Sequence, residues 1–161
     1  CRSERRPQDS RHVRQDVEDR EHALMIEFLA YTGLRWGEAA ALRIRHLNML
    51  RRRVSVEDNA VIVKGSYVIG TPKSGTSRIV PMPPHLVKQI AKVCENKTPD
   101  GFLFGDGIDP LPYPHATSGW FTHSVNRAQL VDNTIPTITP HDLRHTAASL
   151  AVSAGAHVKA V

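Results

Sequence analysis

Apolar residues recur at helical spacing in several stretches of this 161-residue chain. The recurrence predicts helices over residues 16–32, 36–42, 83–94, about 116–130 and 139–154. In the first of these, Leu24, Phe28 and Tyr31 fall on one stripe, which predicts its buried face. The last helix carries a stripe of Leu143, Ala147, Leu150, Ala151 and Ala154, and Gly155 supplies its C-cap.

Short runs of β-branched residues predict strands between the second and third helices. These runs are residues 54–56, 61–63, 67–69 and 78–81. The glycine-containing stretch 70–76 between the last two runs is typical of a hairpin tip. The predicted fold class is therefore α+β, a mainly helical domain with a small three-stranded antiparallel sheet. A loop rich in Gly, Pro and Asp is expected over residues 96–114.

Composition narrows the class of protein. The formal net charge is +5 at pH 7, an excess that favours nucleic acid or another polyanion as partner. The two cysteines, Cys1 and Cys94, give neither a disulfide framework nor metal-ligand spacing, so a reducing cytoplasm is expected. No apolar run approaches the roughly 18 residues of a membrane-spanning helix, and no signal peptide is visible.

The chain divides by composition into two parts. Residues 1–15 contain five arginines and almost no apolar side chains, which predicts either a solvated, disordered tail or a basic interdomain linker along a phosphate backbone. Residues 16–161 are expected to form one domain.

The start of the last helix holds the first candidate chemistry. Thr139 and Asp142 have capping-box spacing, with Pro140 at the first helical position. His141 and Arg144 are then neighbours at i and i+3 on the rim of the helix. A proton-transfer group beside a fixed cation suits an anionic oxygen that is attacked or released.

Further cations lie earlier in the chain. Arg35 stands at a helix start, where Glu38 either fixes its guanidinium or forms an ordinary surface ion pair with it. Arg43, Arg45 and the arginines at 51–53 form either a solvated face or a phosphate-tracking patch. Lys73, in the expected hairpin tip, is either an exposed loop lysine or a mobile cation or acid above a ligand.

Three motifs occur in a familiar order. They are residues 32–38 (TGLRWGE), Lys73 before a Ser-Gly turn that leads into residues 78–81 (RIVP), and residues 141–146 (HDLRHT). Over residues 18–161 the chain resembles the catalytic domain of tyrosine recombinases, the phage-integrase family. The resemblance implies site-specific DNA breakage and rejoining through a 3′-phosphotyrosyl intermediate, without ATP, metal or other cofactor.

The resemblance also implies a role for each site residue. Arg35 and Arg144 would clamp the non-bridging phosphate oxygens, Lys73 would protonate the leaving 5′ oxygen, and His141 would transfer a proton or position the phosphate. Glu38 and His145 would hold these groups in place without contacting the phosphate themselves. The expected DNA-binding residues are Arg43, Arg45, Lys73 and Arg78.

The expected nucleophile is not among residues 1–161. The family places it after the His-x-x-Arg helix, whereas Tyr31, Tyr67 and Tyr113 all precede His141. The nucleophile is therefore expected beyond Val161, which would leave this chain a cleavage-incompetent fragment that also lacks the family's core-binding domain.

The resemblance implies partners as well. They are double-stranded attachment-site DNA and host DNA-bending proteins. The parent protein, bacterial or phage-encoded, would form a tetramer on DNA, and the fragment would be a monomer.

Other functions fit parts of the pattern. A recombinase-like DNA-binding regulator would need the positive charge but not this geometry. A zinc site could use His141 and His145 at i and i+4, but only Asp142 stands nearby as a third ligand. In a basic α+β domain without this chemistry, His141 would merely cap a helix.

Overall fold

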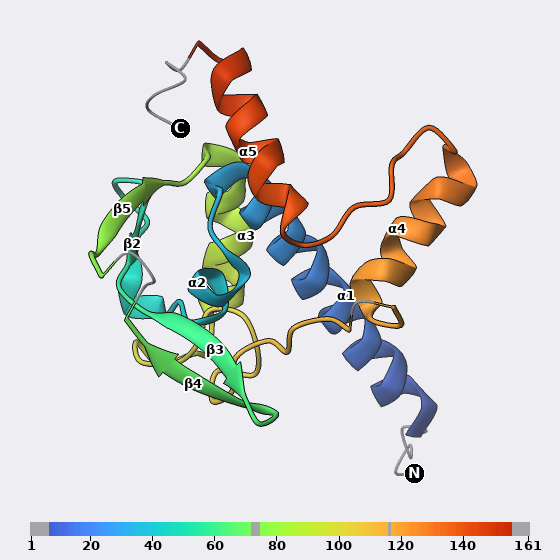
Figure 1. The fold of residues 1–161 in the computed structure, drawn as a ribbon. Coiled ribbons are helices and arrows are strands. Elements are labelled where there is room, and N and C mark those ends of the chain that lie inside the picture. The colour runs from blue at the N-terminus through green and yellow to red at the C-terminus, as the bar shows by residue number, and fades with distance from the viewer. Residues whose placement is uncertain (1–6, 72–74, 116, 156–161) are drawn as a thin grey trace.

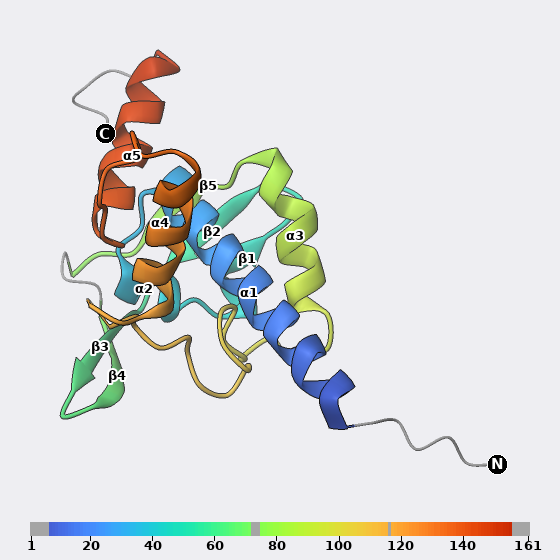
Figure 2. The ribbon, with the colours of Figure 1, turned by 90° about the vertical axis from the view of Figure 1, so that its right-hand side faces the viewer.

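The structure, a computed structural model, describes residues 7–71, 75–115 and 117–155. The long helix α1 (Pro7–Thr32) runs through the molecule, and the other elements gather around its C-terminal part (Figures 1 and 2). The remaining helices are α2 (Trp36–Ala40), the 3₁₀ turn η1 (Ile44–His46), α3 (Pro84–Cys94), α4 (Trp120–Val131) and α5 (Asp142–Ser153). No helix within these described ranges is long and apolar enough to cross a membrane.

The core forms where α1 meets α3, α4 and the loop over residues 95–119. From α1 it takes Leu24, Met25, Phe28 and Leu29, as the apolar spacing predicts. The loop contributes the buried run 102–104, and the ring of Phe104 meets that of Phe28 edge-on at 5.4 Å. Each fully buried side chain of this size stabilises the fold by about 1.5–3 kcal/mol.

The strands form two separate antiparallel sheets. The first has the order β1–β2–β5 and consists of β1 (Leu47–Asn48), β2 (Arg53–Val56) and β5 (Arg78–Pro81). Val54 and Val56 of β2 are buried beneath it. The second sheet pairs β3 (Asn59–Val63) with β4 (Ser66–Gly70). The predicted α+β class with a small three-stranded sheet is confirmed, and the two-stranded sheet is an addition to it.

The predicted hairpin tip over residues 70–76 is wrong, because β4 pairs with β3 and β5 pairs with β2. Lys64 and Gly65 both have positive φ, 50° and 83°, so they close a two-residue hairpin between β3 and β4. The chain after Gly70 instead connects the two sheets. Lys73 lies on this connection, outside the described residues.

The first helix starts earlier than its apolar pattern predicts, at Pro7 rather than near Asp16. The added turns contain Val13 as their one aliphatic residue, so they show no hydrophobic period, although Gln and Arg are good helix formers and proline suits a first turn. The predicted boundary between residues 15 and 16 therefore falls inside α1. A linker role for residues 1–15 stays a prediction, and residues 1–6 lie outside the described part.

Two residues predicted to be buried are exposed. Tyr31 is 46% exposed in the last turn of α1, where its ring packs edge-on against His85. Leu150 on α5 is 42% exposed, and of the predicted α5 stripe only Leu143 is deeply buried. Figure 1 shows why the C-terminal part of the α5 stripe is exposed: this end of the helix extends beyond the other helices and the sheets.

Candidate active site

The helix α5 meets the turn that follows α1. Gly33 turns the chain there with a φ of +65°, which favours glycine. Arg144 on α5 donates a hydrogen bond from Nη1 to the carbonyl oxygen of Gly33 at 2.8 Å. A Cβ atom on Gly33 would stand 3.3 Å from the Cβ of Ala147, so the two segments pack closely. Two of the motifs, 111 residues apart at this contact, therefore adjoin in space.

Arg35 and Glu38 are joined across the start of α2. The backbone N–H of Arg35 donates to Oε2 of Glu38 at 2.9 Å, and its guanidinium Nη1 donates to Oε1 at 3.3 Å. The side chain of Glu38 is only 1% exposed, whereas that of Arg35 is 43% exposed. The surface-pair interpretation is therefore wrong for the carboxylate, which lies buried because α2 packs its other residues into the core.

The main partner of Glu38 is Arg78 on β5. Its guanidinium donates from Nη1 to Oε1 at 2.9 Å and from Nη2 to Oε2 at 2.7 Å, a bidentate pair. Burial alone would raise the pKa of Glu38, but the hydrogen bonds from Arg78 and from the Arg35 backbone outweigh it and hold the pKa below its ordinary value. The same pairing raises the pKa of Arg78.

Sequence reasoning missed this pair, since it assigned Arg78 to DNA and gave Glu38 only Arg35 as partner. A signal was available in the run Trp36–Leu42, where Glu38 is the only charged residue. A carboxylate in such a run is buried when the helix packs, and a buried carboxylate requires a cation. The sequence could not say which cation, because the two residues stand 40 positions apart.

The two histidines of α5 lie on its exposed side. Their rings meet edge-on, with centroids 5.8 Å apart. The helix begins at Asp142 with His141 as N-cap, so the predicted start at Thr139 and Pro140 is slightly early. Both the backbone N–H and the hydroxyl of Thr139 donate to the Asp142 carboxylate at 2.7 Å, and these bonds lower the pKa of Asp142.

The zinc interpretation finds no support. Throughout the described ranges, no three or more His, Cys, Asp or Glu side chains form a group that could hold a metal ion. His141 and His145 therefore have no third ligand among these residues.

A cleft of about 520 Å³ opens between α1, α5 and β5. Arg78, Arg144 and His145 are among its lining residues, and the two arginines give it positive charge. The rest of its wall is small or apolar: Thr32, Gly33, Val80, Pro81, Ala147, Ala148, Ala151 and the ring of Tyr31. Arg35 and His141 do not line this cleft; Arg35 is connected to it through Glu38 and Arg78.

The other predicted DNA-binding arginines are tied to the loop over residues 95–119. The guanidinium of Arg43 lies 4.3 Å above the ring centre of Phe102 and donates to the Asp100 carbonyl oxygen. Arg45 pairs with the Asp100 carboxylate. Neither lines the cleft, and their DNA-binding role stays a prediction.

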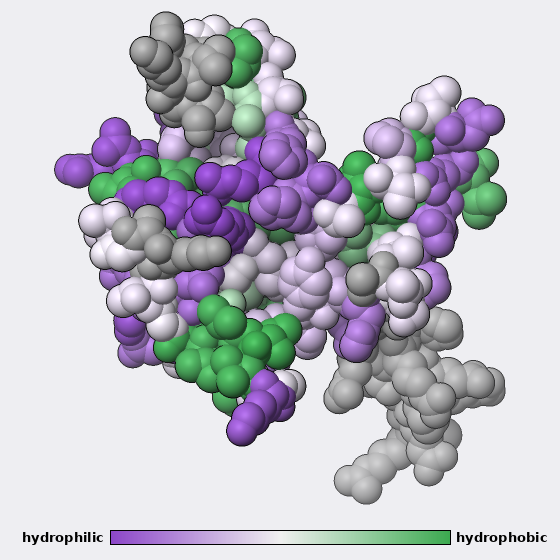
Figure 3. All heavy atoms as spheres, viewed as in Figure 1, coloured by the Kyte–Doolittle hydropathy of each residue, from purple (hydrophilic) through white to green (hydrophobic). Residues whose placement is uncertain are grey.

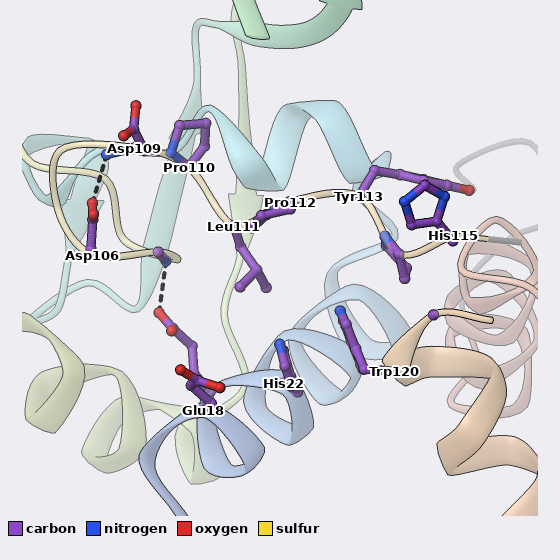
Figure 4. A pocket seen from close by; sticks show the side chains of 14 residues that line it. Glu18, His22, Asp106, Asp109, Pro110, Leu111, Pro112, Tyr113, His115 and Trp120 are labelled. Carbon is purple, nitrogen blue, oxygen red and sulfur yellow. Dashed lines mark hydrogen bonds between the residues drawn. The ribbon is translucent and has the colours of Figure 1, made fainter. Parts of the chain in front are cut away.

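A second cavity, of about 700 Å³, has the opposite character (Figure 4). One wall is the imidazole of His22 stacked on Trp120, with ring centres 4.0 Å apart. The charged groups around it include four carboxylates, those of Glu18, Glu21, Asp106 and Asp109. Negative charge repels phosphate, so this cavity does not suit a nucleic-acid backbone.

Comparison with known proteins decides the family. The phage integrase family matches residues 10–161. The chain belongs to the phage integrase family. It is similar in sequence to tyrosine recombinases and integrases. The resemblance noted from the three motifs is therefore confirmed.

Individual relatives agree with this family. The chain is 26% identical over 136 residues to a tyrosine recombinase of Thermosipho africanus, covering 84% of this chain and 42% of that protein. It is 30% identical over 139 residues to the integrase of Mycobacterium phage L5, covering 81% of this chain and 36% of that one. The chain thus spans less than half the length of either relative.

Solved structures of an integrase and of a recombinase share the fold. The Tn1549 transposon integrase in complex with transposon right end DNA superposes with a TM-score of 0.71 at 24% identity, over 97% of this chain and 55% of that one. XerA recombinase superposes with a TM-score of 0.55 at 21% identity, over 86% of this chain and 51% of that one.

Proposed function

We propose that the protein containing this chain breaks and rejoins DNA at specific sites through a 3′-phosphotyrosyl intermediate. The observation that carries the proposal is the hydrogen bond from Arg144 to Gly33, two residues before Arg35. It brings the two arginine motifs side by side without any ligand. A phosphoryl-transfer transition state gathers negative charge on the non-bridging oxygens, and cations held in place stabilise it more than the ground state.

The proposed roles follow the chemistry of each group. Arg35 and Arg144 bind the non-bridging oxygens, since a guanidinium can grip two of them. His141 moves a proton to or from the tyrosine hydroxyl or positions the phosphate. Lys73 protonates the leaving 5′ oxygen. Glu38 and His145 support these groups.

The nucleophile in this proposal is a tyrosine outside residues 1–161. Tyr67 uses its hydroxyl to donate to the Leu111 carbonyl oxygen at 3.0 Å. Tyr113 packs its ring against Trp36, with centres 5.3 Å apart. Tyr31 is the one that lines the cleft with Arg144, and the test below therefore includes it. A polypeptide of residues 1–161 would then bind DNA as a monomer without cleaving it.

The partners in the proposal are double-stranded attachment sites and, for the full-length protein, three further copies on two duplexes. Host DNA-bending proteins would assist the assembly. The Tn1549 relative, described as bound to transposon end DNA, supports DNA as the ligand. A bacterial cytoplasm is the expected location, with a phage or prophage as the source of the gene.

Covalent trapping tests the proposal. The full-length protein is mixed with nicked attachment-site DNA in EDTA, and a protein–DNA adduct is sought on a denaturing gel. We expect an adduct that is lost when the downstream tyrosine is changed to Phe and kept in Tyr31→Phe. Arg144→Ala should abolish the adduct while site-specific binding stays nearly intact.

The alternatives give different results. Binding without any adduct would favour a DNA-binding regulator. An adduct formed by residues 1–161 alone, and lost in Tyr31→Phe, would make Tyr31 the nucleophile and overturn the assignment to a later residue.

A further inference from the structure

Four hydrogen bonds converge on one buried carboxylate, that of Glu38. Two come from the guanidinium of Arg78, at 2.7 and 2.9 Å. The other two come from the backbone and the guanidinium of Arg35, at 2.9 and 3.3 Å. A carboxylate offers about four lone-pair positions, so Glu38 has no acceptor capacity left.

The two arginines share this carboxylate unequally. Arg78 makes the shorter, paired contacts, whereas the Arg35 guanidinium makes one long contact and stays 43% exposed. Arg78 therefore neutralises Glu38, and the charge of Arg35 remains available to a ligand. Without Arg78, the buried carboxylate would attract the nearest remaining cation, which is Arg35.

The position of Arg78 fits such a role. It stands at the first residue of β5, and its side chain lines the cationic cleft together with Arg144 and His145. Its guanidinium reaches Glu38 on α2, so one ion pair ties the three-stranded sheet to the helix that Arg35 begins. Movement of the sheet relative to α2 would therefore change the contacts of Arg35.

We propose that Arg78 is a positioning residue, which holds and neutralises Glu38 so that the Arg35 guanidinium stays free to bind a phosphate. The inference rests on the proposed recombinase function. It differs from the prediction that Arg78 itself binds DNA. Arg78 then contributes to cleavage through Arg35, and its loss should change the cleavage rate far more than the affinity for DNA.

The experiment uses the full-length protein and nicked attachment-site DNA. Single-turnover rates of adduct formation are measured at saturating DNA, and dissociation constants are measured separately. Arg78→Met should slow adduct formation by about 10- to 100-fold, since small misplacement of a catalytic group has effects of this size. The dissociation constant should stay within about threefold.

A second substitution gives the decisive readout. In Arg78→Met/Glu38→Gln the pair is neutral, so no buried charge remains to capture Arg35. We expect this double variant to form the adduct at least about fivefold faster than Arg78→Met alone. Arg78→Lys keeps the charge but cannot form the bidentate pair, so it should recover only part of the rate.

The ion pair of Lys97 with Glu21 supplies the matched control. The Lys97 side chain is mostly buried, lies 3.6 Å from the Glu21 carboxylate, donates to the carbonyl oxygens of Leu103 and Gly105, and does not line the cleft. Lys97→Met should lower the stability but leave the cleavage rate of the folded protein unchanged.

The possible outcomes test the role of Arg78 separately from the proposed recombinase function. If the wild-type protein forms no adduct, the proposed function fails. If the wild-type protein forms an adduct, three results would each overturn the inference. They are a tenfold loss of DNA affinity in Arg78→Met, a double variant no faster than Arg78→Met, and Lys97→Met as slow as Arg78→Met.

Discussion

The two halves of the candidate site are built in different ways. The half around Glu38 is internally complete, because a buried carboxylate binds Arg78 and Arg35 through four hydrogen bonds. The half on α5 is open. Its histidines are exposed, and Arg144 donates a hydrogen bond to the carbonyl oxygen of Gly33.

The difference has a physical reason. A carboxylate buried among apolar residues loses its hydration, so it must be paired in the fold itself before any ligand arrives. The two histidines are exposed and Arg144 is partly exposed, so these groups keep contact with water and need no buried counter-charge. The Glu38 half is therefore held by contacts within the fold, whereas the exposed groups of the α5 half face solvent.

The surface shows a second contrast of this kind. The two-stranded sheet is tied to the body by the buried Ala60 and by Tyr67. Val61, Ile62, Val63 and Val68 of this sheet are about half exposed, and a hydrophobic area lies over β3 and β4 in Figure 3. The first sheet buries Val54 and Val56 completely, so the two sheets differ in how much of them the core holds.

The largest expected effect concerns the attachment of α5. Leu143 is its one deeply buried apolar residue within the described part of the helix. Leu143→Ala should lower the free energy of unfolding by about 2–4 kcal/mol, the usual cost of such a cavity. Urea unfolding would measure it, with the exposed Leu150→Ala as control, for which a loss below about 1 kcal/mol is expected. Equal losses would contradict the burial of Leu143 and the exposure of Leu150.

The next effect concerns the buried carboxylate. Glu38→Gln replaces an acceptor oxygen with an NH₂ group that faces the donors of Arg78 and Arg35. The free energy of unfolding should fall by about 1–3 kcal/mol. Glu18→Gln, on the exposed side of α1, should change it by less than about 0.5 kcal/mol in the same urea titration. A Glu38→Gln variant as stable as the wild type would show that this half of the site is not preorganised by its charge.

A smaller effect tests the contact between the halves. Gly33→Ala must adopt positive φ and also bring its Cβ to 3.3 Å from Ala147. The strain alone costs about 1–2 kcal/mol. Gly65→Ala also requires positive φ, at 83°, but its Cβ would have nothing within 4 Å, so it serves as the control for backbone strain. Thermal unfolding should show Gly33→Ala as the less stable variant; the reverse order would argue against close packing of α5 on this turn.

The smallest effect is the pH dependence of stability. The pKa of Glu38 is lowered in the folded protein, so the unfolded chain binds more protons than the folded one as the pH falls below about 4.5. The stabilisation is complete above that pH and is lost as the pH falls through the folded pKa. Between about pH 5 and pH 3, wild-type stability should therefore fall more steeply than that of Glu38→Gln in urea titrations. Parallel curves would show that Glu38 does not titrate as a paired carboxylate.

Local pattern was enough to predict much of this protein. Helix α3 follows its prolines and apolar spacing, α4 is found within a few residues of its predicted range, and the loop over residues 96–114 is correct. The stripe of Leu24 and Phe28 is buried as predicted. These features depend on neighbours within a turn or two, which the spacing of residues records directly.

Other features depended on the tertiary structure. Three such features depend on segments far apart in the sequence. They are the pairing of β5 with β2, the exposure of Tyr31 and Leu150, and the ion pair of Arg78 with Glu38. Hydrophobic spacing shows which side of an element is apolar but not which surface covers it. The sequence by itself determined that Glu38 is the only charged residue in the apolar run Trp36–Leu42 and that the chain contains many arginines. Only the tertiary structure, which places Arg78 of β5 beside Glu38 of α2, decided which arginine forms the bidentate pair with the carboxylate and which stays largely exposed.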